Sequence, residues 1–312
     1  MKKVIFMGTP AFSVPILQAL IDEETIEIVG VVSQPDRKVG RKQIITPPPV
    51  KQLAMEHNLT MYQPEKLSGS DEMKEILTLD IDLIITAAYG QYVPTKLLNA
   101  PTHRAINVHA SLLPKYRGAA PIHYAVLNGD EKTGVTIMYM EKEMDAGNII
   151  SQREIAINDE DDTGNLFEKL SLVGRDLLMD TLPAIFAGEN ESIVQNEDEV
   201  TFSPMISKEQ EKIDWTLTAR EVFNHIRALR PAPGAYTILE DQRFKIWAAE
   251  VVEDNTLAEP GTIIFADTKE MYVACGEGSV LSLIEVQPSG KKRMPVANFL
   301  AGTQIEKATL FN

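Results

Sequence analysis

The first 190 residues alternate between short apolar runs and segments with helical periodicity. Apolar runs rich in β-branched residues, each short enough for a buried strand, lie at 4–7, 26–32, 81–87, 105–108 and 135–140. Helix-like segments lie between or after them at 10–21, 50–57, 72–79, 119–127 and 165–186, the last followed by Gly188. Strands that alternate with helices predict an α/β fold with a doubly wound, mostly parallel sheet. Such sheets bind ligands beyond the carboxyl ends of their strands.

The last third of the chain has a different pattern. A polar, acidic stretch at 190–212 is typical of a linker, and a helix-like segment at 219–230 follows it, stopped by Pro231 and Pro233. Short strand candidates lie at 235–239, 244–252, 262–265, 271–274 and 280–286. Short strands of this kind favour a small β-barrel, of which the OB-fold is one common type. We therefore expect two domains, at 1–189 and 213–312.

Composition is that of a folded globular protein. Hydrophobic residues make up 44% and charged residues 24% of the 312 positions. The single cysteine, Cys275, rules out an internal disulfide and fits a reducing cytoplasm. No apolar stretch approaches the length that crosses a bilayer, so we expect no membrane association.

The net charge of −15 argues against a nucleic-acid partner, but the distribution of charge weakens this argument. Two local clusters are basic, one in a Gly- and Pro-containing loop and one near the C-terminus. They consist of Arg37, Lys38, Arg41, Lys42 and Lys51, and of Lys291, Lys292 and Arg293. Charge alone leaves a solvated loop and a phosphate-binding surface equally open for each cluster.

Asn107 and His109 stand at the carboxyl end of one predicted strand. Because side chains alternate along a strand, these two residues point to the same face and converge on one small group. An amide donor beside an imidazole suits an oxyanion site with acid–base chemistry, although Asn-x-His is also common in turns. Three downstream carboxylates, Glu141, Glu143 and Asp145, are possible partners for the histidine.

Cofactor and metal motifs are lacking. The first strand runs into Gly8-Thr9-Pro10 without the G-x-G-x-x-G of a dinucleotide site, which disfavours an NAD-dependent oxidoreductase. The five histidines show no i, i+4 pair, and Cys275 is alone. We expect no metal.

Long motifs give a family resemblance over nearly the whole chain. The stretch from Asn107 to Gly147, with SLLPKYRGAAPI and MDAGNII, resembles the active-site region of the folate-dependent formyltransferases. Further segments resemble the branch of that family that acts on initiator methionyl-tRNA: IFMGTPAFSVPIL, SQPDRKVGRKQ, TPPPVK, AAYGQYVP and EKIDW. The resemblance implies a Rossmann-like formyltransferase domain and an OB-like C-terminal domain that binds tRNA.

The resemblance also implies site residues. The catalytic Asn, His and Asp of the family fall on Asn107, His109 and Asp145, and the donor is implied to be 10-formyltetrahydrofolate. Folate contacts fall on Ser111, Leu112, Leu113 and Pro114, and on Ala88, Tyr89, Gly90, Gln91 and Tyr92. The implied tRNA contacts are Arg37, Lys38, Arg41 and Lys42 in the loop at 34–49, with Lys291, Lys292 and Arg293 as further candidates. For Arg117 and Gly118, holding the shape of the loop is as plausible as touching a ligand.

Two alternatives remain open beside the dehydrogenase. A sugar-nucleotide formyltransferase shares the motif around His109 and differs in its acceptor. A folate- or tRNA-binding module without catalysis is disfavoured by the intact Asn107, His109 and Asp145.

Arg227 and Arg230 are further candidates for a basic face of the second domain. We also expect the protein to be a monomer.

Overall fold

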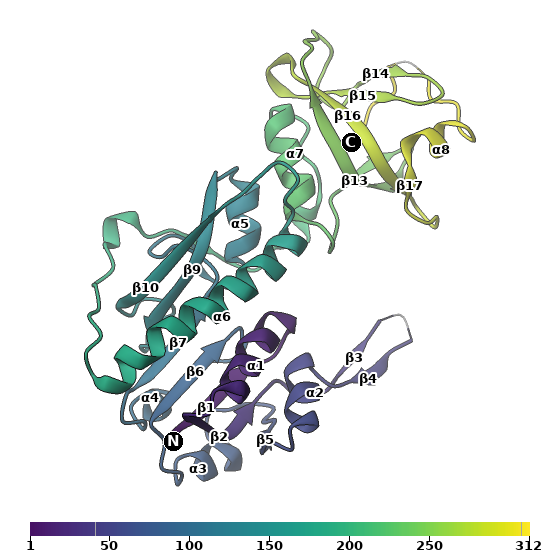
Figure 1. Ribbon diagram of the computed structural model, residues 1–312. Helices are drawn as coiled ribbons and strands as arrows, with labels where there is room; N and C mark the ends of the chain where they lie inside the picture. The colour runs from purple at the N-terminus through teal and green to yellow at the C-terminus, as the bar shows by residue number, and fades with distance from the viewer. Residues whose placement is uncertain (41, 307) are drawn as a thin grey trace. The chain divides into compact units, whose positions relative to one another are not determined.

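The computed structural model describes residues 1–40, 42–306 and 308–312, and the chain forms two compact units (Figure 1). The first unit comprises residues 1–121, 132–156 and 167–204, and the second comprises 122–131, 157–166 and 205–312. The second unit therefore takes in all but the first residue of α5 (Pro121–Leu127) and the start of α6 (Thr163–Ala187). Within the predicted linker, residues 190–204 belong to the first unit.

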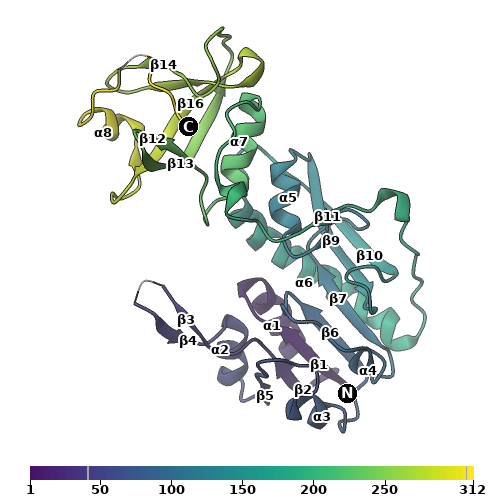
Figure 2. The ribbon, with the colours of Figure 1, turned by 180° about the vertical axis from the view of Figure 1, so that it is seen from behind.

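A seven-stranded sheet forms the centre of the first unit, in the order β10-β9-β7-β6-β1-β2-β5. Its strands are β1 (Lys2–Gly8), β2 (Ile26–Val32), β5 (Met61–Tyr62), β6 (Leu83–Ala87), β7 (Ala105–His109), β9 (Lys132–Tyr139) and β10 (Ile149–Ala156). The strands β5, β2, β1, β6 and β7 are parallel to one another. At the edge, β9 runs antiparallel to β7, and β10 runs antiparallel to β9; Figure 2 shows β10 outside β9.

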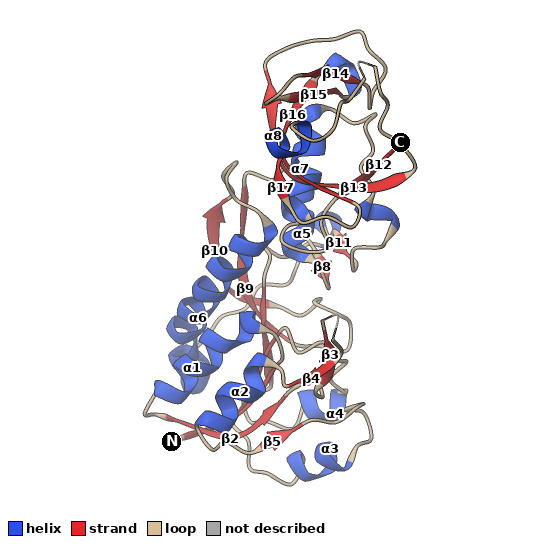
Figure 3. Ribbon diagram, turned by 90° about the vertical axis from the view of Figure 1, so that its right-hand side faces the viewer, coloured by secondary structure: helices blue, strands red, loops and turns tan. Residues whose placement is uncertain are grey.

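Helices cover both faces of this sheet, as predicted. On one face lie α1 (Val14–Asp22) and α6, which are side by side in Figure 3. A Cβ on Gly174 of α6 would lie 2.9 Å from the Val108 side chain, so glycine allows this helix to approach β7 closely. On the other face, α3 (Asp71–Ile76) and α4 (Thr95–Leu98) bury apolar side chains against β1 and β6. The predicted α/β fold class is confirmed.

Several short elements were not apparent from the sequence pattern. The basic loop contains a two-stranded hairpin, β3 (Arg37–Val39) with β4 (Ile44–Thr46), before α2 (Pro49–Glu56). A second small sheet pairs β8 (Arg117–Gly118) with β11 (Phe202–Ser203). The polar stretch also forms short 3₁₀ turns at Glu197–Glu199 and Glu209–Glu211. In the part of the chain that the structure describes, no helix has the length and apolar character needed to span a membrane.

The second unit is built on a curled antiparallel sheet and one amphipathic helix, α7 (Ala219–Ala228). A capping box begins the helix: the Thr218 side chain accepts from the Glu221 N–H, and the Glu221 carboxylate accepts from the Thr218 N–H. The sheet has the order β12-β13-β16-β15-β14, with β17 also paired to β16. Its strands are β12 (Tyr236–Leu239), β13 (Gln242–Val252), β14 (Ile263–Ala266), β15 (Met271–Ala274), β16 (Val280–Pro288) and β17 (Met294–Pro295), and α8 (Val296–Leu300) follows.

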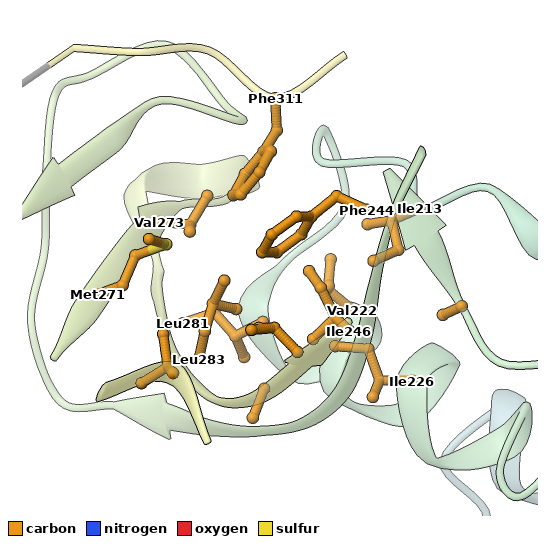
Figure 4. Close-up of a cluster of buried hydrophobic side chains, with 14 of the residues drawn as sticks. Ile213, Val222, Ile226, Phe244, Ile246, Met271, Val273, Leu281, Leu283 and Phe311 are labelled. Carbon is orange, nitrogen blue, oxygen red and sulfur yellow. The ribbon is translucent and has the colours of Figure 1, made fainter. Parts of the chain in front are cut away.

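The concave side of this sheet holds a separate hydrophobic core. Val222 and Ile226 of α7 meet Phe244 and Ile246 of β13 there, as Figure 4 shows. Cys275 lies in the same cluster, and burial raises the pKa of its thiol to about 12, so it is a packing residue.

Residues 308–312 join the two edge strands of the curled sheet. Thr309 accepts a hydrogen bond from the N–H of Ile263 at the β14 edge, and Asn312 and Ile238 of β12 exchange a pair of backbone hydrogen bonds. Phe311 packs between them, stacked on Trp215 with ring centroids 5.5 Å apart. The sheet is therefore barrel-like, as predicted.

Candidate active site

Asn107 lies on β7 directly beside Thr86 of β6, near the carboxyl ends of both strands. The Thr86 hydroxyl donates a 2.7 Å hydrogen bond to Asn107 Oδ1. The Asp145 carboxylate only accepts, so the amide atom that faces its Oδ1 at 3.5 Å is Nδ2, and Oδ1 is the end that accepts from Thr86. Because 3.5 Å is a long hydrogen bond, the amide N–H keeps donor capacity for a bound group.

His109 is the last residue of β7 and is 5% exposed. Its Nε2 lies 3.0 Å from the carbonyl oxygen of Tyr116. A carbonyl only accepts, so Nε2 carries the hydrogen. The other ring nitrogen, Nδ1, faces Asp145 Oδ2 at 3.7 Å. Both nitrogens thus face oxygen atoms, but only Nε2 is within hydrogen-bond distance of its partner.

Asp145 lies in the loop between β9 and β10, with its carboxylate turned toward β7. Its Oδ2 accepts a 2.9 Å hydrogen bond from the Gly118 N–H, and its side chain is 12% exposed. Its φ of 53° lies in the left-handed region, which is costly for a residue with a Cβ. Glu141 instead pairs with Arg104 at 3.6 Å, and Glu143 is exposed. Of the three possible carboxylates, the structure brings Asp145 to the histidine.

The predicted folate segment at 111–114 is held by internal hydrogen bonds. Ser111 is fully buried, and its hydroxyl donates to the Lys115 carbonyl at 2.7 Å. The Leu113 side chain is buried, and its carbonyl accepts from Gln152 Nε2 at 2.8 Å. Leu112 and Pro114 are partly exposed. Ser111 and Leu113 therefore shape the segment, and their partly exposed neighbours offer the surface for a ligand.

The second predicted folate segment follows β6. Ala88, Gly90 and Tyr92 are exposed, with φ of 47° at Ala88 and 85° at Gly90. Tyr89 points the other way: its side chain is 4% exposed and packs in the apolar core under α3 and α4. Desolvation raises the pKa of its hydroxyl. Gln91 is partly buried, and its side chain accepts a hydrogen bond from the Leu67 N–H at 2.8 Å.

Three of the four predicted tRNA contacts of the basic loop, Arg37, Lys38 and Lys42, belong to the described part of the hairpin. Arg37 on β3 forms an exposed ion pair with Glu65 at 2.8 Å. Lys38 and Lys42 are exposed. Arg41, the central residue of the prediction, lies outside the described residues. Lys51 is drawn into the base of the loop by an ion pair with Asp36 at 2.9 Å, where it anchors the hairpin.

The basic candidates of the second unit divide into exposed and internal residues. Lys291, Lys292 and Arg293 are exposed between β16 and β17, although Arg293 pairs with Glu285 and lies over the Trp247 ring. Arg227 is 5% exposed and donates to the Asn158 carbonyl at 2.7 Å, and Arg230 pairs with Asp162 at 3.1 Å. The last two arginines hold the unit together and do not present free charge.

The loop between His109 and α5 is closed by Arg117 and Gly118. Arg117 is 2% exposed and forms an ion pair with Glu197 at 2.8 Å. Gly118 has a φ of 126°, and a Cβ there would lie 2.8 Å from the Ser203 carbonyl oxygen. Both residues thus hold the shape of the loop.

Thr86 is a site residue that the sequence pattern did not reveal. Its signal is a hydroxyl in the otherwise apolar run Leu83-Ile84-Ile85-Thr86-Ala87, since a buried hydroxyl needs a partner. Among the described residues, no three His, Cys, Asp or Glu side chains gather in a way that could hold a metal ion. An amide donor, a buried imidazole and a carboxylate are suited to stabilise an oxyanion in acyl transfer.

Comparison with known proteins identifies what this chain resembles. Residues 1–182 match the family described as "Formyl transferase", and residues 205–304 match "Formyl transferase, C-terminal domain". Methionyl-tRNA formyltransferase of Enterococcus faecalis is 54% identical over 97% of this chain and 96% of its own length. The Staphylococcus aureus protein of that name is 53% identical over 97% of both chains.

Solved structures show the same fold at low identity. A Helicobacter canadensis N-formyltransferase, crystallised with folinic acid and dTDP-3-aminofucose, matches with a TM-score of 0.70 and 19% identity, over 92% of this chain and 100% of that one. A sugar 3N-formyl transferase with dTDP and 5-N-formyl-THF also has a TM-score of 0.70 and 19% identity, covering 94% of this chain and 99% of that one.

Proposed function

The chain belongs to the formyl transferase family, and we propose that it transfers a formyl group from 10-formyltetrahydrofolate to the amino group of initiator methionyl-tRNA. The product is formylmethionyl-tRNA for translation initiation. The observation that carries this proposal is the meeting of Asn107, His109 and Asp145 at one end of the sheet. The acceptor follows from relatives that share more than half of their residues with this chain along almost its full length.

The folate donor is supported by one partly exposed and one exposed surface beside this trio. Leu112 and Pro114 lie on one side, and Ala88, Gly90 and Tyr92 lie on the loop after the neighbouring strand β6. Exposed apolar and backbone groups of this kind suit the flat ring of a pterin, with few polar contacts setting its orientation. We propose that these five residues contact the donor.

The reaction joins an amine to a formyl carbon. The neutral amino nitrogen of the methionyl group attacks the formyl carbon, a C–N bond forms, and the carbonyl oxygen becomes an oxyanion. The bond between that carbon and N10 of the folate then breaks. The amine loses one proton and N10 gains one, so protons balance and the products are the formylated amine and tetrahydrofolate.

Three side chains divide the work of this reaction. The Asn107 amide donates to the developing oxyanion, where the loss of one preorganised donor costs about 2.7–4 kcal/mol of barrier. His109 Nδ1 lies 3.7 Å from Asp145, too far for a hydrogen bond, and moves the proton toward the leaving nitrogen, an effect worth roughly 10²- to 10⁴-fold. Asp145 faces Nδ1 of His109 from 3.7 Å and orients the imidazole.

The tRNA surface is supported by two groups of exposed cations. Lys38 and Lys42 stand on the hairpin, and Lys291 and Lys292 lie between β16 and β17. Exposed lysines suit phosphate contacts, which position a nucleic acid without reading its sequence. We propose that both groups contact initiator tRNA, that the protein acts as a monomer and that, as a translation enzyme, it works in the cytoplasm.

The test is an acceptor comparison. Purified protein with 10-formyltetrahydrofolate is given initiator methionyl-tRNA, elongator methionyl-tRNA or an aminosugar nucleotide, and formyl transfer is measured. Fast transfer to the initiator and slow transfer to the other two is the expected result. Preferred transfer to the sugar would overturn the acceptor, and no transfer to any of them would overturn the function.

A further inference from the structure

One buried glutamine stands out in the polar segment that ends the first unit. Between residues 191 and 205 the chain is exposed or partly exposed at every position except Gln195 and Ser203. Gln195 is 4% exposed and Ser203 is fully buried. A buried amide in an otherwise solvated stretch needs partners for its polar atoms, and those partners identify what the residue does.

The Gln195 amide ties together two loops of the active site. Its Oε1 accepts from Arg117 Nε at 3.0 Å, and its Nε2 donates to the carbonyls of Asp145 and Gly147 at 2.7 and 2.8 Å. The orientation of this amide is unambiguous, because a guanidinium only donates and a carbonyl only accepts. Gln195 therefore links the loop that follows His109 to the loop that carries Asp145.

The same segment also holds the Tyr116 carbonyl in place, which accepts a hydrogen bond from His109. Thr201 Oγ1 accepts from the Tyr116 N–H at 2.9 Å, and the Ser203 hydroxyl donates to the Tyr116 carbonyl at 3.1 Å. That carbonyl is the acceptor of the hydrogen bond from His109 Nε2. The orientation of the imidazole thus depends on a loop that the segment at 195–203 keeps in place.

Both linked loops carry backbone strain. Tyr116 has a φ of 63° and Asp145 a φ of 53°. A residue with a Cβ persists in this conformation only where its surroundings hold it. At Asp145 the main chain is held by Gln195, while the carboxylate accepts from Gly118. Without the Gln195 donors, fewer hydrogen bonds would keep the loop in this conformation.

We propose that Gln195 is a positioning residue for catalysis, which fixes Asp145 and the Tyr116–Gly118 loop so that the carboxylate and the imidazole keep their relation. This role rests on the proposed function, because its effect is on the rate of formyl transfer. Gln195 acts through Asp145 and His109 and does not touch the substrates. The hydrogen bonds that its amide donates to the Asp145 and Gly147 carbonyls contribute more to the rate than the bond that its oxygen accepts from Arg117.

Two substitutions of Gln195 separate the contribution of its hydrogen-bond donors from that of its acceptor. Gln195→Glu keeps an acceptor for Arg117 but turns carboxylate oxygens toward two carbonyls, whereas Gln195→Met has nearly the same shape and removes every side-chain hydrogen bond. We expect both to lower kcat by about 10- to 100-fold, the range for displaced catalytic groups and for removal of the groups that support them. KM for donor and acceptor stays within about twofold, since ligand surfaces are unchanged.

The matched control is Gln18→Met, the same chemical change at a partly exposed glutamine of α1 whose amide bonds only to Asp22 in the described structure. It should keep the parent kcat. The proposal is overturned if Gln195→Glu retains the parent kcat, since the Arg117 bond alone would then be sufficient. It is also overturned if either Gln195 variant raises KM while kcat is unchanged.

A second readout is independent of the acceptor. In protein with isotope-labelled histidine, the Gln195 substitutions should move the His109 side-chain resonances and leave those of His225, in the second unit, in place. Unmoved His109 resonances would overturn the positioning role even if the protein were active. If the parent protein fails to formylate initiator methionyl-tRNA, the proposed function is wrong, and these spectra still test the inference. Unmoved His225 resonances also show that a variant is folded.

Discussion

The Thr86 hydroxyl donates a 2.7 Å hydrogen bond to Asn107 Oδ1, across two neighbouring parallel strands. Together with the Asp145 carboxylate, which only accepts and faces Nδ2, this bond fixes the Asn107 amide with its oxygen occupied and an N–H left as donor. A donor that is fixed before the reaction needs no reorganisation when charge develops on the substrate.

Thr86→Val replaces the hydroxyl by a methyl group of similar size. We expect kcat to fall by about 10- to 100-fold with little change in KM, because the amide loses the partner that holds its oxygen. Thr181→Val is the control: this buried threonine of α6 bonds to the Leu177 carbonyl of its own helix and to the Ser151 hydroxyl of β10. Equal kcat in the two variants would show that the Thr86 hydroxyl has no catalytic effect.

Removing two lysines of the hairpin should weaken the binding of tRNA and leave the binding of folate unchanged. For the double variant Lys38→Ala, Lys42→Ala we expect a higher KM for tRNA and an unchanged KM for the donor. Removing each lysine that binds a phosphate should reduce the slope of log affinity against log salt by about one. Titration of tRNA binding at several salt concentrations measures this slope. A slope equal to that of the parent protein would exclude these two lysines from the interface.

The second unit should lose stability as the medium becomes acidic. His225 of α7 donates from Nε2 to the Gln210 carbonyl at 2.7 Å, and burial lowers the pKa of its imidazole below the ordinary value of about 6.5. Below that pH the unfolded chain takes up a proton that the folded unit resists. The stability from the neutral ring is therefore complete above about pH 6.5 and declines as pH falls toward the folded pKa.

His225→Gln retains an N–H donor without a titrating group. Thermal melts from pH 8 to pH 5 should show a smaller loss of stability for this variant than for the parent protein, since all other groups titrate equally in both. Parallel curves over the whole range would contradict the assigned role of His225.

Phe311 should be important for the stability of the barrel-like unit. It is 3% exposed, stacks on Trp215 and contacts Phe244, with the two phenyl centroids 5.6 Å apart. Phe311→Ala should destabilise the unit by about 3–5 kcal/mol, the usual cost of removing a buried phenyl ring. Denaturant unfolding followed by tryptophan fluorescence measures this change. Leu257→Ala, at a fully exposed position, should leave the transition where it is.

The sequence was informative where periodicity decides the structure. The apolar runs around Val4, Ile84 and Ile106 predicted the central strands, because a parallel strand covered on both faces consists almost wholly of apolar residues. The spacing of Asn107 and His109 predicted a shared face at the end of a strand. Each of these inferences needed only neighbouring residues.

Other features depend on partners that are distant in the sequence. Nothing local separates Asp145 from Glu141 and Glu143, since the choice is made by a left-handed backbone and by the Gly118 N–H. Gln195 lies in a stretch with the composition of a linker, and its partners are Arg117 and two carbonyls nearly fifty residues upstream. Polarity predicts exposure there, whereas hydrogen bonding buries this residue.

The most direct test of the proposed site is the rate of formyl transfer to initiator methionyl-tRNA by the parent protein and by Asn107→Ala, measured at saturating donor. We predict rapid transfer by the parent, and a kcat about 10²- to 10³-fold lower in the variant with KM values within a few-fold, because one oxyanion donor is removed. A folded Asn107→Ala protein that transfers formyl groups at the parent rate would contradict the assignment of this site.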